Sequence, residues 1–219
     1  MYTTLAGPEF RQEIEIKRSR FITVLHRTGD EDGARSVLAG LRKEFQNARH
    51  HCSAFVLGPD REVQRSNDDG EPSGTAGIPM LEALLRRETA PGATDLSDVT
   101  AVVVRYFGGI LLGAGGLVRA YSESVSGALA AAPLVQRRRL RICSVKVPHA
   151  AAGRLENELR SAGYVMAETG YEAHVTVLRL ALPDEPAELA RAAERLAAAS
   201  AGSAVLLPGA TEWVDVPLR

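Results

Sequence analysis

The sequence predicts an α+β protein built from two domains. At 219 residues the chain is longer than a typical single domain. Short runs of β-branched residues, typical of buried strands, alternate with segments in which apolar residues recur at helical spacing. An arginine-rich segment begins at residue 137. We therefore place the domain boundary there, between residues 1–136 and residues 137–219.

The first domain is expected to begin with extended chain followed by a helix. Residues 10–28 contain apolar side chains that alternate with charged ones, as they do in strands. The basic segment Lys17–Arg20 interrupts them, and its composition favours a solvated turn. Asp30 is a suitable N-cap for a helix that extends to about Phe45. Residues 50–58 then predict a strand that ends at a Gly-Pro turn.

A polar loop over residues 65–77 carries three carboxylates within four positions, Asp68, Asp69 and Glu71. Carboxylates at this spacing could bind a divalent cation or act in acid–base catalysis. The same segment, Asn-Asp-Asp-Gly, is strong turn chemistry, and the sequence alone favours the turn. A second helix over residues 78–88 is expected to follow.

The segment Tyr106–Tyr121 joins a buried strand at residues 101–104 to a helix over residues 117–132. Its glycines are Gly108, Gly109, Gly113, Gly115 and Gly116. Such a loop can bind phosphate, because the first backbone N–H groups of the following helix are unpaired. Arg119 would add a fixed positive charge. The alternative that the glycines only allow a tight connection stays open, since the segment lacks the Gly-Lys-Ser/Thr ending of a P-loop.

The second domain begins with a basic cluster and continues in a regular rhythm. The cluster consists of Arg137, Arg138, Arg139 and Arg141. Strands are expected at residues 140–147, 164–168, 172–182 and 205–216, and helices at residues 149–161 and 185–199. The order strand, helix, strand, strand, helix, strand predicts a ferredoxin-like split βαβ domain.

Composition and charge limit the classes of function. The net charge is −1, so any basic binding site must be local. The sequence shows neither a signal peptide nor an apolar run of about 18 residues, and we expect a cytoplasmic protein without membrane contact. Cys52 and Cys143 are too far apart for a paired metal motif, and the adjacent His50 and His51 point to opposite faces of a strand. We therefore predict no metal, no cofactor and no catalytic residue.

Three blocks of the sequence resemble the signature motifs of the IMPACT/YigZ family. They are His50–Cys52, Ser66–Leu81 and Val102–Tyr121. Lys17–Ile22 also resembles the family's N-terminal Lys-Ser-Arg-Phe block, with one extra basic residue. The C-terminal half is similar to the small domain of the bacterial members. The resemblance covers nearly the whole chain and is strongest over residues 14–130.

This resemblance implies a fold and a role for each part. The N-terminal domain is expected to adopt the left-handed βαβ fold of translocase elongation factor domain IV, and the C-terminal domain the ferredoxin-like fold of domain V. Eukaryotic members restrain a starvation-sensing kinase with the help of a further N-terminal domain, so that role is not transferred. For bacterial members the usual suggestion is nucleic-acid or ribosome binding.

We therefore predict a non-enzymatic regulator of translation that binds RNA or the ribosome through phosphate contacts. The expected contact residues are Arg105, Arg119, Arg137, Arg138, Arg139 and Arg141. Two alternatives stay open. The glycine loop could serve a phosphate- or nucleotide-dependent enzyme in which Asp68, Asp69 and Glu71 hold magnesium. The loop over residues 65–77 could instead dock a protein partner, such as a peptidase or a translation factor.

Overall fold

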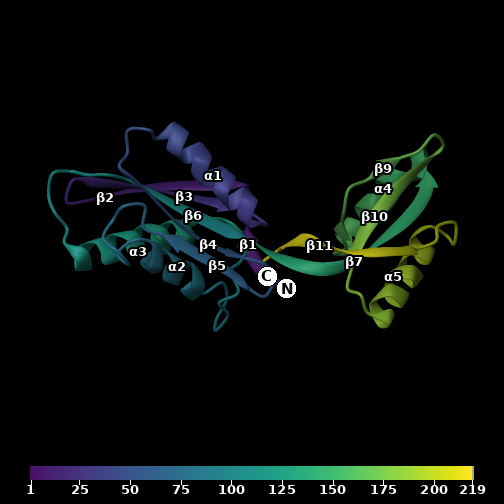
Figure 1. Cartoon of the computed structure of the whole chain (residues 1–219). Coiled ribbons are helices and arrows are strands. Elements are labelled where there is room, and N and C mark those ends of the chain that lie inside the picture. Colours follow the sequence, from purple (N-terminus) through teal and green to yellow (C-terminus); the bar gives the residue numbers. More distant parts are fainter. Residues whose placement is uncertain (219) are drawn as a thin grey trace. The chain divides into compact units, whose positions relative to one another are not determined.

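The computed structural model describes residues 1–218, which form two compact units (Figure 1). The N-terminal unit contains residues 1–136 together with Pro217 and Leu218, and the C-terminal unit contains residues 137–216. Each unit combines helices with an antiparallel sheet, so the predicted α+β fold class is confirmed. No helix within residues 1–218 is long and apolar enough to cross a membrane.

The sheet of the N-terminal unit has five strands in the order β2-β3-β6-β4-β5. The strands are β2 (Glu9–Ile16), β3 (Ser19–Arg27), β4 (His50–Leu57), β5 (Val63–Asn67) and β6 (Val99–Tyr106). Every neighbouring pair is antiparallel. The strand β5 includes residues 65–67, which the sequence predicts as loop. It is a largely exposed edge strand with polar side chains on both faces, so its sequence carries no alternation.

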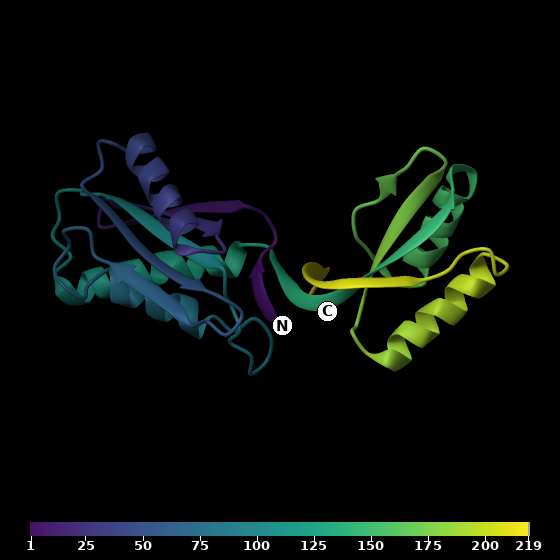
Figure 2. The ribbon, with the colours of Figure 1, turned by 45° about the vertical axis from the view of Figure 1, so that its right-hand side comes forward.

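Helices cover both faces of this sheet, as Figures 1 and 2 show. They are α1 (Glu31–Glu44), α2 (Gly77–Arg86) and α3 (Ala114–Ala131). In β6, Val102 and Val104 pack in one cluster with Leu41 of α1, while Val103 packs in another with Tyr121 of α3. This alternation explains why the centre of the sheet is apolar on both faces.

A short strand, β1 (Tyr2–Leu5), is absent from the sequence prediction because four residues are too few to show a period. It lies beside the segment that precedes β6. The Thr3 amide donates to the Asp95 carbonyl at 3.1 Å, and the Ser97 amide donates to the Thr3 carbonyl at 2.9 Å. The first residues of the chain are thus tied into the N-terminal unit.

The C-terminal unit has a sheet in the order β11-β7-β10-β8, with β9 paired to β10. Its elements are β7 (Leu134–Pro148, which begins in the N-terminal unit), α4 (His149–Ser161), β8 (Val165–Met166), β9 (Gly170–Tyr171), β10 (Val175–Leu182), α5 (Pro186–Ala199) and β11 (Leu207–Pro217). Leu155 of α4 and Leu196 of α5 pack in one core with Cys143 and Leu178 of the sheet. This element order is that of a split βαβ unit. The likeness of each unit to an elongation-factor domain stays a prediction.

Candidate functional site

Three strand ends meet at one edge of the N-terminal sheet. Arg20, the second residue of β3, pairs with Tyr106, the last residue of β6. His50, the first residue of β4, pairs with Arg105. The turn between β2 and β3, the start of β4 and the exit of β6 into the glycine-rich loop therefore lie at the same edge.

Gly108 fixes the glycine-rich loop against the β2–β3 turn. A Cβ atom on Gly108 would lie 2.0 Å from the carbonyl carbon and oxygen of Arg18, so only glycine fits. The Gly108 amide also donates to the Ser19 Oγ at 3.2 Å. Lys17 and Arg18 both have positive φ (48° and 63°), as the two central residues of a tight hairpin require. The glycine-rich loop is thereby held beside a basic turn.

The helix α3 begins without a capping side chain. Its N-cap is Gly113, at φ 74°, and its first turn contains no acidic residue. The Gly113 carbonyl accepts from the Leu117 amide at 2.9 Å, which closes the first helical turn. Among residues 1–218, no group accepts from the backbone N–H of Ala114, Gly115 or Gly116. The end of α3 therefore presents free donors and a partial positive charge.

A cavity of about 320 Å³ borders this end of α3. Its lining combines the helix start, charged side chains and apolar side chains: Arg49, His50, Glu71, Pro72, Arg105, Phe107, Leu111, Leu112, Gly113, Ala114 and Leu117. The lining comes from β4, β6, the loop that follows β5 and the glycine-rich loop. Residues far apart in the sequence thus form one site at this edge of the sheet.

Arg105 lines this site and is buried, with 5% of the residue exposed. Its Nη1 donates to Glu71 Oε1 at 2.6 Å, and the Tyr121 hydroxyl donates to the same oxygen at 2.7 Å. The guanidinium also lies over the rings of Phe21 and Phe107. Glu71 neutralises the charge of Arg105, whereas Arg105 Nε has no hydrogen-bond partner among residues 1–218.

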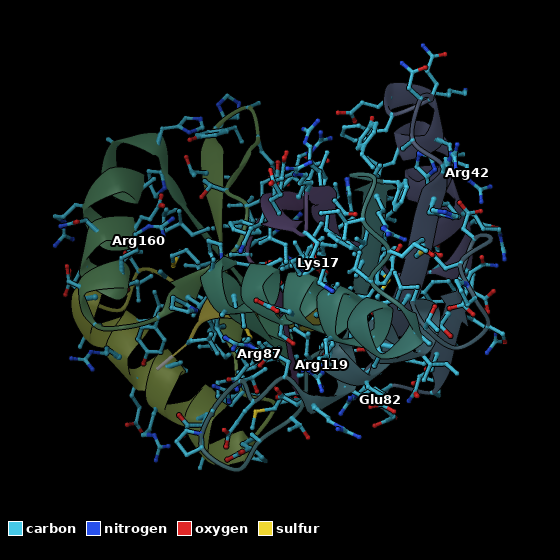
Figure 3. All side chains as sticks on the ribbon, turned by 90° about the vertical axis from the view of Figure 1, so that its left-hand side faces the viewer. Lys17, Arg42, Glu82, Arg87, Arg119 and Arg160 are labelled. Atoms are coloured by element: carbon cyan, nitrogen blue, oxygen red, sulfur yellow. The ribbon has the colours of Figure 1, made fainter. Side chains whose placement is uncertain are left out.

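Four exposed cations, which we call the basic rim, come from three segments: Lys17 and Arg18 in the β2–β3 turn, Arg49 before β4, and Arg119 in α3. In the described part of the chain, their side chains make no hydrogen bond or ion pair. Figure 3 labels Lys17 and Arg119 on opposite sides of α3. Of these four, only Arg119 is predicted from the sequence as a contact residue; the sequence favours a solvated turn for the segment with Lys17 and Arg18. The signals for them were the Lys17–Ile22 block and the place of Arg49 immediately before the His50–Cys52 block.

The acidic loop, residues 68–77, has a structural role at its first carboxylate. Asp68 accepts hydrogen bonds from the backbone N–H groups of Gly74, Ala76 and Gly77 at 2.7–3.0 Å, which caps the start of α2. Burial acts to raise the pKa of Asp68, but these three hydrogen bonds outweigh it and lower the pKa. Asp68 is therefore a helix cap, in agreement with the turn that the sequence favours.

Asp69 holds the acidic loop to its neighbours. Its carboxylate accepts from the His51 amide at 2.7 Å and from Arg42 of α1 at 2.6 Å. Its carbonyl accepts from His50 Nδ1 at 2.9 Å. Since Glu71 binds Arg105 and Tyr121, all three carboxylates of this loop have protein partners.

Cys52 is buried beneath the acidic loop. Its Sγ lies 3.0 Å from the Asp68 carbonyl and 3.3 Å from the Tyr121 hydroxyl. Burial raises the pKa of this thiol to about 12 and also raises the pKa of Tyr121. A thiol with so high a pKa stays protonated at neutral pH, so Cys52 is a packing residue and not a nucleophile.

The arginines of the C-terminal cluster belong to the other unit, on β7, and most of them have partners there. Arg137 Nη2 donates to the Trp213 carbonyl at 3.2 Å. Arg139 donates to Thr211 at 3.2 Å, and Arg141 pairs with Asp184 at 2.8 Å. Arg138 makes no hydrogen bond or ion pair within residues 1–218. These contacts fasten β7 to β11 and to the end of β10.

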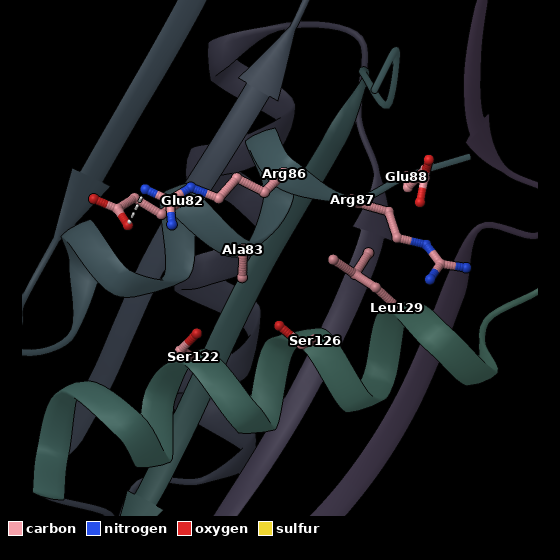
Figure 4. Close-up of a pocket in the computed structure, with 8 residues that line it drawn as sticks. All are labelled: Glu82, Ala83, Arg86, Arg87, Glu88, Ser122, Ser126 and Leu129. Atoms are coloured by element: carbon pink, nitrogen blue, oxygen red, sulfur yellow. Dashed lines mark ion pairs between the residues drawn. The ribbon is translucent and has the colours of Figure 1, made fainter. Parts of the chain in front are cut away.

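A second cavity, of about 250 Å³, lies between α2 and α3 (Figure 4). Ser122 lies across from Ala83, and Leu129 lies near Arg87, so the two helices run in the same direction. Arg86 in its wall pairs with Glu82 at 3.1 Å. Because the helices run in the same direction, both N-termini lie at the end that carries the first cavity.

Comparison with known proteins identifies both units. The Impact N-terminal domain model matches residues 17–129, and a domain of unknown function (DUF1949) matches residues 145–203. A solved structure described as the crystal structure of an hypothetical protein is 38% identical. The match has a TM-score of 0.57 and covers 94% of this chain and 96% of that one.

Two curated bacterial proteins are similar over most of their length. IMPACT family member YigZ of Escherichia coli is 40% identical over 195 residues, which cover 88% of this chain and 91% of that protein. IMPACT family member YvyE of Bacillus subtilis is 46% identical over 163 residues, which cover 74% of this chain and 72% of that protein. The match to the Impact N-terminal domain and these relatives show that the chain belongs to the IMPACT family.

Proposed function

We propose that this chain is a cytoplasmic, non-enzymatic regulator of translation that binds RNA or the ribosome through phosphate contacts. One observation carries the proposal: the uncapped N-terminus of α3 lies at the same edge as Lys17, Arg18 and Arg49 of the basic rim. Helix N-termini and arginine side chains are standard partners of nucleic-acid phosphates. The proposed principal contact surface is that of the N-terminal unit.

The local charge supports this assignment. The whole chain has a net charge of −1, yet the four cations of the basic rim have no acidic partner in the described part of the chain. A cation that the fold does not use is available to a phosphate. Elsewhere on the surface, by contrast, arginines pair with carboxylates, as Arg11 does with Glu44 and Arg20 does with Glu13 at 2.6 Å.

Binding fits the site better than phosphoryl-transfer chemistry. A magnesium-dependent enzyme needs carboxylates that are free to coordinate the ion. Here Asp68 caps α2, Asp69 binds Arg42, and Glu71 binds Arg105. Of the predicted contact residues, the proposal gives Arg119 the principal role. Arg138 and Arg139 are secondary candidates, because Arg105 and Arg141 are engaged in ion pairs.

The test is the binding of a fluorescein-labelled RNA hairpin by anisotropy, measured over a series of salt concentrations. Wild-type affinity is expected to fall steeply with salt, since each phosphate contact releases about one counterion. Replacement of Lys17, Arg18, Arg49 and Arg119 by glutamine, one at a time, should weaken binding and lower the salt slope by about 1 each.

The matched control is Arg35→Gln on α1, an exposed arginine that pairs with Asp32 at 2.8 Å. This change should leave both the affinity and the salt slope unaltered. Cosedimentation with ribosomes, with the same variants, extends the test to the assembled particle. Affinity that does not depend on salt, or equal loss in the control and the rim variants, would contradict the proposal.

A further inference from the structure

The cavity beside α3 offers more than a surface for backbone phosphates. Its volume, about 320 Å³, is in the range of sites for small molecules. One side is the uncapped helix start at Gly113 and Ala114. Another is apolar and includes Phe107, Leu111 and Leu112. A ligand that fits both sides has an anionic group joined to an apolar, flat body.

Arg105 is a second cationic side chain in the wall of this cavity. It lines the cavity, is 5% exposed, and its Nε has no hydrogen-bond partner in residues 1–218. Leaving a buried donor unpaired is costly. The Nε atom itself is buried, so a ligand in the cavity meets Arg105 through the few exposed atoms of its side chain. Arg49, exposed at the mouth, adds a charge that no carboxylate in the described chain neutralises.

The apolar side exposes large side chains to solvent. Phe107 is 44% exposed and Leu111 is 82% exposed. The Phe107 ring centroid lies 5.8 Å from the Arg105 guanidinium, so this contact helps to orient the ring. Adjacent exposed apolar residues mark binding surfaces, and an aromatic ring is a platform on which a nucleic-acid base of any kind can stack.

His50 adds a polar group of known orientation. Its Nδ1 lies 2.9 Å from the Asp69 carbonyl, which can only accept, so Nδ1 carries the proton. In the neutral ring, Nε2 is then an acceptor. Because His50 lines the cavity, this nitrogen suits a ribose hydroxyl or a base N–H.

We propose that the cavity binds one nucleotide unit, with its phosphate at the N-terminus of α3 beside Arg49 and its base against Phe107 and Leu111. The inference deepens the proposed function and rests on it, since it names the part of the RNA that this edge receives. The same unit can arrive as a free nucleoside monophosphate or as one nucleotide of an RNA strand. The experiment below separates the two sources.

The first measurement is isothermal titration calorimetry of the full chain with AMP, GMP, CMP and UMP, and with inorganic phosphate and adenosine as the two halves of the ligand. Mononucleotides are expected to bind more tightly than either half. Ala114→Asp, which places a carboxylate at the helix start, should weaken mononucleotide binding about tenfold or more, by charge repulsion. The neutral variant Ala114→Asn, of matched size, should retain binding.

The base contact is tested separately. Phe107→Ala should weaken mononucleotide binding roughly 5- to 150-fold, the effect of one lost stacking contact, and leave phosphate binding unchanged. Tyr171→Ala is the control, because Tyr171 is an exposed aromatic residue of the C-terminal unit. Anisotropy with a labelled single-stranded RNA, with mononucleotides as competitors, identifies the source. If mononucleotides compete efficiently with the RNA, the ligand is a free nucleotide. If they compete weakly and RNA binding depends on Phe107, the ligand is one nucleotide of an RNA strand.

Two results overturn the inference. If RNA binds, Phe107→Ala has no effect, and mononucleotides bind no better than phosphate, the cavity takes no nucleotide while the proposed function stands. If neither RNA nor mononucleotides bind, both the inference and the proposed function fail.

Discussion

Two loops of the N-terminal unit each lead into a helix, but only one of them supplies a cap for the helix N-terminus. The acidic loop leads into α2 and the glycine-rich loop leads into α3, and these helices run side by side in the same direction (Figure 4). At α2, Asp68 accepts from three backbone N–H groups, and Pro79 in the first turn has no N–H at all. At α3, no side chain among residues 1–218 caps the helix.

This difference shows how the fold separates structure from binding. The carboxylates of the acidic loop satisfy donors of the protein, so they are not free to bind a cation. The glycines leave the donors of α3 open, and Gly108 holds their loop beside the basic turn. A helix N-terminus that the protein caps itself contributes to stability, whereas one that it leaves open can contribute to binding.

The largest expected effect comes from breaking the ion pair between Glu71 of the acidic loop and Arg105 of β6, just before the glycine-rich loop. Arg105→Met leaves the Glu71 carboxylate buried and without its cation, which should lower the free energy of unfolding by about 3–5 kcal/mol. Urea denaturation followed by circular dichroism measures it. The double variant, Arg105→Met with Glu71→Leu, should recover much of the loss. A cost below 1 kcal/mol for the single variant would show that the pair does not join the loops.

The next largest effect concerns the capped N-terminus of α2. Asp68→Asn removes the charge of the cap and should lower the free energy of unfolding by about 1–3 kcal/mol at neutral pH. Because the folded protein lowers the pKa of Asp68, its contribution is complete above the ordinary pKa of an aspartate and is lost as the pH falls towards the folded value.

The variant should therefore lose less stability than wild type between about pH 5 and pH 3. Denaturation curves at several pH values test this. Asp60→Asn, in the exposed turn after Gly58, is the control and should behave like wild type. Identical pH profiles for Asp68→Asn and wild type would remove Asp68 from the capping role.

The smallest effect has the opposite sign and concerns α3. Ala114→Asp places a carboxylate at the N-terminus of α3, where α2 already has that of Asp68. It should therefore raise the free energy of unfolding by about 0.3–1 kcal/mol and weaken RNA binding. Ala114→Asn should change both quantities less. Loss of stability in Ala114→Asp would show that the helix end is not an open cationic site.

Local patterns predict the elements of the fold well. The cap at Asp30 predicts the start of α1, and the Asp30 side chain does accept from the Gly33 amide at 2.7 Å. The α+β class also follows from the order of the elements. The sequence does not predict β1, because it is very short, or β5, because it is polar and exposed.

The candidate site is predicted only in part, because much of it depends on pairing between distant segments. The glycines and Arg119 stand out in the sequence as a possible phosphate loop. That Lys17 and Arg18 lie beside this loop follows only from the antiparallel pairing of β3 with β6. Likewise, the partner of Glu71 is 34 positions away on another strand, and no local pattern identifies it.

The most direct test of the account compares the two helix ends in one experiment. Amide chemical shifts of the ¹⁵N-labelled chain are recorded during titration with a short RNA hairpin. The account predicts shifts at Ala114, Gly115 and Gly116, and little change at Ala76 and Gly77, whose N–H groups Asp68 already binds. Equal shifts at both helix ends, or none at the start of α3 while RNA binds elsewhere, would contradict it.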